Sequence, residues 1–322
     1  MPSTIAATAD SLNRHAVQYN PNILQILRTG LECEKAFAAR SCDNTYSAVN
    51  ATAGEVIQPY QSGFTPKNTV TFDAEEAKLQ IIKIDVQFTA DELAKYYDSW
   101  RIEWHEIGKD PLEWSFARYV YEVILLPKAI EEMNHNAMNG EYAAPTAGTA
   151  GLSINSVDGY IKRFKDGVAA GRIVEIATGA IGAGDAVSKI ESFCDGLPEK
   201  YRDLPGTIYA SHTVARYYAR DYRGQFGTGN GVAGNENTTL NVDYSNKRVR
   251  PLHCLSGSNG LIFVPDTRAT LNWGTRNGFP SMPQIRWEAQ ERVVKGLCEF
   301  YRFYSYEFAE EVFINDQFTP AA

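Results

Sequence analysis

Apolar and polar residues alternate over one segment in the first third of the chain. The apolar positions on every second residue are Ile82, Ile84, Val86 and Phe88, with Lys83, Asp85 and Gln87 between them. Because successive side chains of a strand point to opposite faces, this alternation predicts a half-buried strand. Upstream, extended segments are broken by turn residues at 59, 63 and 66. The pattern predicts a long β-hairpin over residues 46–88, whose second limb begins at Thr69.

The predicted hairpin is long for a chain of this size. Each limb has about 15 to 20 residues, and at roughly 3.3 Å per residue the hairpin reaches about 50 to 65 Å. A domain of ordinary size has no internal need for such an element. The length therefore suggests that the hairpin contacts something outside its own subunit.

Two helix starts follow the hairpin. Each has a side-chain acceptor with an acid three residues later, first at Thr89 and Glu92, then at Asp110 and Glu113. This spacing is typical of a helix N-terminus, because the two side chains cap free backbone N–H groups. In the second helix Pro111 takes the first helical position, where its missing N–H costs nothing.

The second of these helices is predicted to be long. Apolar residues recur at every third or fourth position, and Asn139-Gly140 follows the last of them. We expect a helix over residues 110–138, about 40 Å long at 1.5 Å per residue. Pro127 is expected to bend it, since the proline ring clashes with the carbonyl one turn back.

A second lobe is predicted after a linker at 143–152, which contains two glycines and a proline. Helix and strand patterns then alternate. Asp185 and Ser211 are predicted helix caps, and Thr207–Ala210 and Leu261–Pro265 are predicted short strands. Toward the end, residues 285–314 predict a long aromatic-rich pair of strands hinged near Gly296.

The first 60 residues have a different character. They are rich in Ala, Ser, Thr and Asn, and they contain only one short apolar stretch, at Ile23–Leu27. Such a segment buries too little surface to fold alone. We expect an N-terminal arm that lies on another part of the assembly.

Composition limits the possible functions of the chain. Its 322 residues are 44% hydrophobic and 22% charged, as in folded proteins, and the length favours at least two lobes. The net charge of -8 and the pI near 5.3 argue against a nucleic-acid reader. Five scattered cysteines form no C-x-x-C pair and are expected to be reduced. The sequence shows neither a signal peptide nor a run of 18 apolar residues.

Several segments match catalytic or binding motifs only weakly. Residues 229–234 read G-x-G-x-x-G, but they follow a predicted helix instead of joining a strand to a helix. Residues 179–189 lack the G-K-[ST] end of a phosphate loop, and His105-Glu106 lacks a second histidine. Ser211 beside His212 reads as a helix cap. We therefore predict no catalytic, cofactor-binding or metal-binding residue, no cofactor, and no enzyme.

The order of these elements resembles the major capsid proteins of tailed bacteriophages, which have the Hong Kong 97 fold. The most specific stretch is Gly184–Gly227, GDAVSKIESFCDGLPEKYRDLPGTIYASHTVARYYARDYRGQFG, which is similar to the axial domain of that family. LPKAIEEMNHNAMNG resembles the end of the spine helix, and LIFVPDTRATLNWGT resembles the strand and turn before the chain returns to the peripheral domain. The resemblance covers nearly the whole chain.

The resemblance implies an α+β fold with an N-terminal arm, an extended β-hairpin loop, a peripheral domain with a long spine helix, and an axial domain. The implied divisions are an arm at 1–45, an extended loop at 46–88, a peripheral domain at 89–150 with the spine helix at 110–138, an axial domain at 151–283, peripheral return strands at 284–316, and a tail at 317–322.

The implied function is a major capsid protein that assembles into pentamers and hexamers of an icosahedral phage head. The head would enclose double-stranded DNA without sequence-specific binding, and the protein would be made in the host bacterial cytoplasm and reside in the virion capsid. Implied partners are other copies, portal, scaffolding and possibly decoration proteins, with no membrane. Because the chain starts directly with the arm, any scaffold is expected to be separate. Lys67 and Lys78 lie in the hairpin, but no acid is evident as a catalyst, so crosslinking is not predicted.

Two alternatives remain open from sequence. An encapsulin-type nanocompartment shell protein would have the same fold and no genome inside. A cytosolic α+β enzyme with an unrecognised site belongs to a different class, and a small oligomer that never assembles would favour it.

Overall fold

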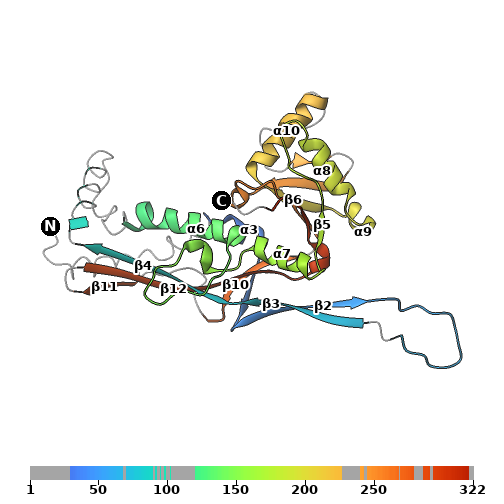
Figure 1. Cartoon of the computed structure of the whole chain (residues 1–322), viewed down its shortest axis with the longest axis horizontal. Coiled ribbons are helices and arrows are strands. Elements are labelled where there is room, and N and C mark those ends of the chain that lie inside the picture. Colours follow the sequence, from blue (N-terminus) through green and yellow to red (C-terminus); the bar gives the residue numbers. More distant parts are fainter. Residues whose placement is uncertain are drawn as a thin grey trace.

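The structure is a computed structural model of the chain. It describes residues 30–67, 70–89, 91–92, 95, 98, 102, 120–226, 240–242, 245–267, 269–278, 286–290 and 293–318. These residues form two β-sheets, a separate two-stranded hairpin and several helices (Figure 1). The hairpin extends from one end of the molecule, well beyond both sheets (Figure 1).

The hairpin consists of β2 (Thr45–Ala53) and β3 (Val70–Lys78), nine residues each. They pair antiparallel without interruption from Thr45 opposite Lys78 to Ala53 opposite Val70. The predicted second limb is wrong beyond Lys78, where β3 ends. Residues 80–89 form β4, which leaves the hairpin and joins a sheet.

The first sheet has the order β1–β10–β12–β11, and β4 also pairs with β12. Its strands are β1 (Ala38–Cys42), β4 (Gln80–Thr89), β10 (Leu271–Arg276), β11 (Arg286–Gln290) and β12 (Val293–Tyr306). β4 lies antiparallel to β12 from Thr89 opposite Val293 to Gln80 opposite Arg302. The half-buried strand predicted from the alternation is therefore confirmed. Its partner is β12, and the paired residues Thr89 and Val293 are more than 200 positions apart in the sequence.

The predicted hinge near Gly296 is wrong. β12 runs through Gly296 as one strand of 14 residues, and Gly296 is opposite Val86 on one side and Trp287 on the other. A glycine flanked by paired strands on both sides is held extended by the ladders, so its conformational freedom produces no bend here.

The long helix continues through the described part of its predicted range. A π-helical turn, η1 (Val120–Leu125), leads into α6 (Leu126–Asn139), while residues 110–119 lie outside the described residues. Pro127 lacks the N–H that an α-helical turn would use, and the wider π turn ends just before it. α6 ends at Asn139, as predicted. Gly140 has a φ of -59°, so its backbone conformation does not require glycine. The lack of space does, because a Cβ would lie 2.3 Å from the carbonyl oxygen of Val157.

The second sheet has the order β5–β13–β9–β6–β8–β7. Its strands are β5 (Val174–Ile176), β6 (Gly206–Ala210), β7 (Leu240–Asn241), β8 (Lys247–Pro251), β9 (Ile262–Pro265) and β13 (Phe313–Asn315). The remaining helices are α3 (Glu32–Ala36), α7 (Tyr160–Ala169), α8 (Ala186–Asp195), α9 (Glu199–Arg202) and α10 (His212–Phe226), with short 3-10 helices η2 (Ser153–Ser156), η3 (His253–Leu255) and η4 (Ala309–Glu311).

The second sheet is buried on both faces. Ile208 and Phe263 pack in a cluster with residues of α8 and α10, whereas Tyr209, Ile262 and Ile314 pack in a second cluster with α7 and β12. The sheet is thus a middle layer between these helices and the rest of the molecule (Figure 1). Continuous burial on both faces explains why the central strands β6, β9 and β13 are short runs without alternation, whereas β8, nearer the edge, alternates between buried and exposed residues.

Two expected strand placements are corrected by the pairing. β10 falls within the predicted axial segment, yet it pairs with β1 and β12 of the first sheet. β13 falls within the predicted peripheral return strands, yet it pairs with β5 and β9 of the second sheet. Both strands are short, so their own sequences carry little information about which partner they choose.

Two of the three predicted caps that lie in the described region are confirmed. The Thr89 N–H donates to the Glu92 carboxylate at 2.8 Å, and the Glu92 N–H donates back to the Thr89 hydroxyl at 3.4 Å. The Ser211 hydroxyl accepts the N–H three residues on at 3.3 Å. The Asp185 prediction is right in position but wrong in its acceptor, since Asp185 is the N-cap residue and its side chain makes no cap hydrogen bond. Asp221 of α10 instead accepts the N–H of the second residue of α8 at 2.9 Å.

Candidate assembly surface

The two faces of the β2–β3 hairpin differ in chemistry. The register places the following residues on one face: Val49, Val70, Phe72 and Ala74. The opposite face carries these: Asn50, Thr71, Asp73 and Glu75. Phe72 is 74% exposed and Val49 is 62% exposed. The hairpin therefore has an apolar face that its own subunit leaves bare.

The tip of the hairpin is also apolar and exposed. Tyr60 and Phe64 are each 94% exposed, and Ile57 is 91% exposed. The tip is held together by polar contacts, since Lys67 Nζ donates to the Ile57 carbonyl at 2.9 Å and to Glu55 at 3.0 Å. A large exposed apolar surface usually marks a site that another molecule covers, because each Å² of apolar surface removed from water stabilises the complex by about 25 cal/mol.

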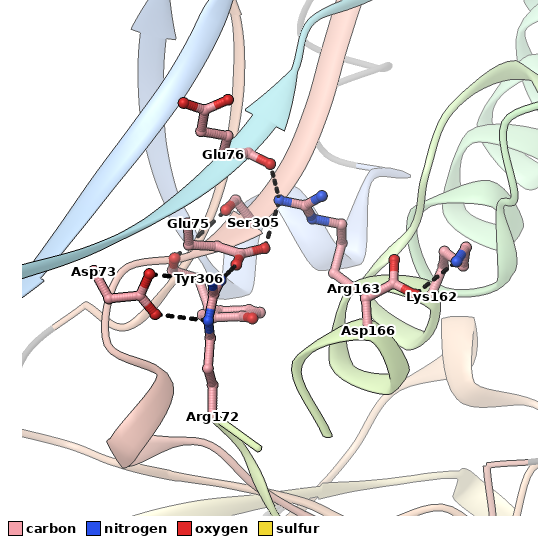
Figure 2. A network of polar contacts seen from close by, with 9 residues as sticks. All are labelled: Asp73, Glu75, Glu76, Lys162, Arg163, Asp166, Arg172, Ser305 and Tyr306. Carbon is pink, nitrogen blue, oxygen red and sulfur yellow. Dashed lines mark hydrogen bonds and ion pairs between the residues drawn. The ribbon is translucent and has the colours of Figure 1, made fainter. Parts of the chain in front are cut away.

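A network of ion pairs holds the polar face of the hairpin to its own subunit (Figure 2). Arg172 binds Asp73 with an Nε–Oδ2 distance of 2.7 Å and also binds Glu75. Arg163 of α7 binds the Glu75 carboxylate at 2.8 Å and donates to the Glu76 carbonyl at 2.5 Å. The Glu75 side chain is only 10% exposed, so the two guanidinium groups compensate the cost of burying its carboxylate. The base of the hairpin is thereby fixed in direction.

The other strand of the hairpin has a separate anchor. Tyr46 donates its hydroxyl to Glu307 at 2.8 Å, and Arg40 donates to the same carboxylate oxygen at 2.7 Å. The Tyr46 ring stacks on Phe303 with a centroid distance of 5.0 Å. Burial and the bond to Glu307 raise the pKa of Tyr46, so the hydroxyl keeps its proton and remains a donor. Both strands are thus attached to the body of the subunit at the base of the hairpin.

A groove lies between α6, β4 and the segment 142–157. Its volume is about 1790 Å³. β4 contributes Ile82, Ile84 and Val86, which are only half-buried, and α6 contributes Ala129 and Met133. The predicted apolar face of β4 therefore faces its own helix without being fully covered by it.

A short helix that sequence analysis missed, α3, is attached to the first sheet by a buried ion pair. Arg302 Nε donates to Glu34 at 2.8 Å, with side chains 1% and 5% exposed. The Arg302 guanidinium also lies 4.8 Å from the centre of the Trp273 ring, whose Nε1 donates to the Glu34 carbonyl at 3.0 Å. Burial raises the pKa of Glu34, while Arg302 opposes that shift. The five residues of α3 show no helical period, so no signal in the sequence indicated this anchor.

The weak catalytic motifs have structural positions where they are described. Residues 229–234, His105 and Glu106 lie outside the described residues. The backbone N–H of Gly179 donates to Asp316 at 3.1 Å, and Lys189 Nζ donates to the Thr178 carbonyl at 2.5 Å. The Gly179 N–H and the Lys189 ammonium group thus bind atoms of the protein itself, whereas in a phosphate loop such groups bind the phosphate. Within the described part of the chain, no three His, Cys, Asp or Glu residues gather as metal ligands, and no helix is long and apolar enough to cross a membrane.

No protein-family model matches the chain, and no curated protein matches it. Solved structures do match. A chain of the satellite phage P4 procapsid, which includes the size determination (Sid) protein, gives a TM-score of 0.54 at 10% identity, covering 92% of this chain and 98% of that chain. A chain of the capsid of an empty GTA particle gives 0.51 at 12% identity, covering 91% and 97%.

A third match is the capsid of a native GTA particle, with a TM-score of 0.50 at 11% identity over 90% of each chain. At this identity a likeness shows the fold alone. The helices and strands of this chain thus have the arrangement found in capsid particles over nearly its whole length, and the α+β, Hong Kong 97-type fold that the sequence resemblance implied is confirmed.

Proposed function

We propose that this chain is a major capsid protein that self-assembles into the pentamers and hexamers of an icosahedral phage head. The hairpin is the observation that carries the proposal. Its polar face is bound to its own subunit by Arg163 and Arg172, while its apolar face and tip remain exposed. A two-stranded ribbon is not stable by itself in water, so this geometry is explained by a neighbouring copy that covers the apolar face.

The proposed contact is heterologous. The hairpin of one copy lies across the body of the next, and the half-open groove between α6 and β4 is a further apolar surface for a neighbour. Identical contacts of this kind generate rings when the rotation closes, and rings of subunits form a shell. Interfaces that hold permanent assemblies commonly bury about 2,000 Å² or more.

The domain division follows the same proposal. The arm is shortened from 1–45, since β1 pairs with β10 and the side chains of Cys33 and Phe37 are buried in the core. The axial domain 151–283 lies around the centre of each ring, and the peripheral domain contains 89–150 and 284–316. The extended loop is shortened to β2, β3 and their tip, since β4 pairs with β12. β10 and β13 cross between the two domains by their pairing.

In this proposal the shell encloses double-stranded DNA without reading its sequence. The net charge of -8 supports containment of DNA over tight binding, because a strongly basic lining would bind the genome through its phosphates. Portal, scaffolding and decoration proteins are the proposed partners. The protein is made in the host bacterial cytoplasm and acts in the virion capsid as a structural protein, not as an enzyme.

A loop-deletion variant tests the proposal. Ala48 and Glu75 are opposite each other in the hairpin, so residues 49–74 can be replaced by an Asn-Gly turn that keeps the Glu75 ion pair with Arg163. The full chain is expected to form capsomers or shells in negative-stain images, alone or with a scaffold. The variant should keep its circular dichroism and melting curve but sediment as a small species.

A matched control is the replacement of one exposed apolar residue outside the hairpin, Val174→Ser on β5, which should leave shell formation intact. Unfolding of the deletion variant would show that the hairpin belongs to the core and would overturn the argument. Particles that enclose a cargo protein and no DNA would identify an encapsulin-type shell instead. A full chain that stays a small oligomer at every concentration and salt tested would contradict both shell functions.

A further inference from the structure

Two cysteines that are far apart in sequence lie together beneath α3. The carboxylate of Glu32 accepts the backbone N–H of His253 at 2.6 Å, so α3 and η3 are directly joined. The residue following each of these is a cysteine, Cys33 and Cys254. The two side chains lie in one core cluster, close enough for the Cys254 thiol to raise the pKa of Cys33.

Cys42 and Cys194 are arranged differently. Cys33 and Cys254 belong to the same core cluster, together with Tyr160 and Tyr304, whereas Cys194 and Cys42 each belong to a different cluster. All five are free thiols. Cys33 and Cys254 therefore form a specific pair, and no function described above uses it.

We propose that Cys33 and Cys254 are a disulfide-forming pair that staples α3 to η3 once the protein leaves a reducing environment. A disulfide needs an S–S distance of about 2.05 Å and Cα atoms about 4.4 to 6.8 Å apart. The hydrogen bond between the preceding residues, Glu32 and His253, brings α3 and η3 together, and rotation of the two cysteine side chains with a small shift of the η3 turn is the movement that the bond requires.

The oxidant in this reaction is a low-molecular-weight disulfide such as oxidised glutathione. The thiolate of Cys254 attacks one of its sulfurs, and the S–S bond breaks to release one glutathione thiolate. The sulfur of Cys33 then attacks the mixed disulfide, forms the bond to Cys254 and releases the second glutathione. Two electrons pass from the cysteines to the oxidant, and the two thiol protons go to the released thiolates.

Access begins at the η3 turn. Cys254 is 5% exposed and Cys33 is 1% exposed, and the neighbours His253, Ser256 and Gly257 are exposed. A short opening of this turn uncovers Cys254 without disturbing the sheets. Burial, and next the neighbouring Cys254 thiol, raise the pKa of Cys33, which makes the oxidation slow near neutral pH and faster in alkaline buffer.

The bond would join distant parts of the chain. Glu32 and His253 are 221 residues apart, so closing this loop removes much freedom from the unfolded chain. It would also fix α3 to η3 at the beginning of the described part of the chain. The oxidised protein should therefore melt several degrees higher than the reduced protein.

The test counts thiols in the purified full chain. The protein is incubated with oxidised glutathione or with dithiothreitol, unfolded in the presence of a maleimide, and weighed by mass spectrometry. The reduced sample should take five labels, one for each cysteine, and the oxidised sample three, with one linked peptide pair that contains Cys33 and Cys254. The rate should rise with pH.

Cys42→Ser is the matched control and should still lose two thiols on oxidation, whereas Cys33→Ala should lose none. Five labels after oxidation, a stable mixed disulfide with glutathione, or a bond between any other two cysteines would overturn the proposal. Should Cys33→Ala fail to fold, the wild-type label count and peptide map decide the question alone. Because the readout needs no shell, its failure is distinct from failure of the proposed function.

Discussion

The hairpin and the second sheet differ in how far their residues are shielded from water within one subunit. In the second sheet, every residue of β6 and β9 is buried, because helices cover one face and the rest of the molecule covers the other. In the hairpin, the outer half of β3 from Val70 to Ala74 is exposed. The sheet is complete within one subunit, whereas the hairpin has a face that only a second molecule can cover. The same β-structure thus serves stability in one region and, in the proposed function, association in the other.

The largest expected difference comes from one phenylalanine in each region. Phe263→Ala in β9 should lower the free energy of unfolding by about 3 to 5 kcal/mol, because a fully buried ring is lost and a cavity is left. Phe72→Ala on the exposed face should change it by less than about 0.5 kcal/mol. Urea unfolding of the unassembled subunit measures both. Equal losses would mean that the hairpin face is part of the core.

The next effect is expected at the base of the hairpin. Glu75→Ala leaves Arg163 and Arg172 without their shared carboxylate and should cost about 2 kcal/mol. The cost is lower than the 3 to 5 kcal/mol of a fully buried pair, because Arg172 is one-third exposed. Asp73→Ala, which affects only the more exposed pair, is the control and should cost less. Hydrogen exchange should become faster in β2 and β3 but not in β6.

A smaller effect is expected from the second anchor. Tyr46→Phe removes the hydrogen bond to Glu307 and keeps the ring on Phe303, so unfolding should become easier by about 1 kcal/mol. The raised pKa of Tyr46 adds a pH dependence. This contribution is present below the ordinary tyrosine pKa near 10 and is lost as pH rises through the raised value. The difference between wild type and Tyr46→Phe should therefore shrink in strongly alkaline buffer.

The smallest effect on stability is expected at the tip, with the largest effect on association. Replacing Tyr60 and Phe64 by serine should alter the melting temperature of the subunit very little, since both side chains are 94% exposed. Sedimentation should nevertheless show weakened or lost assembly. Serine at Val174, exposed but outside the hairpin, provides the comparison. Normal shells from the tip variant would remove the tip from the proposed interface.

Part of the assembly surface was visible in the sequence. The hairpin, its turn region and the alternation of β4 were predicted from local spacing alone. The apolar face was not, because Val49 and Phe72 fall on one side only when the register of β2 and β3 is known. The ion pairs at the base were also missed. Glu75 and Arg172 are 97 positions apart, and a charged residue in a strand or helix ordinarily reads as solvent-exposed.

The sequence by itself determined the features that depend on neighbouring residues. The capping box at Thr89 and the cap at Ser211 follow from side chains within a few residues of the helix starts they satisfy. The tertiary structure decided which strand pairs with which, why β12 continues through Gly296, and why Asp221 caps α8. These choices depend on contacts between segments distant in sequence, where several partners satisfy the same local pattern and only packing of the whole chain selects one.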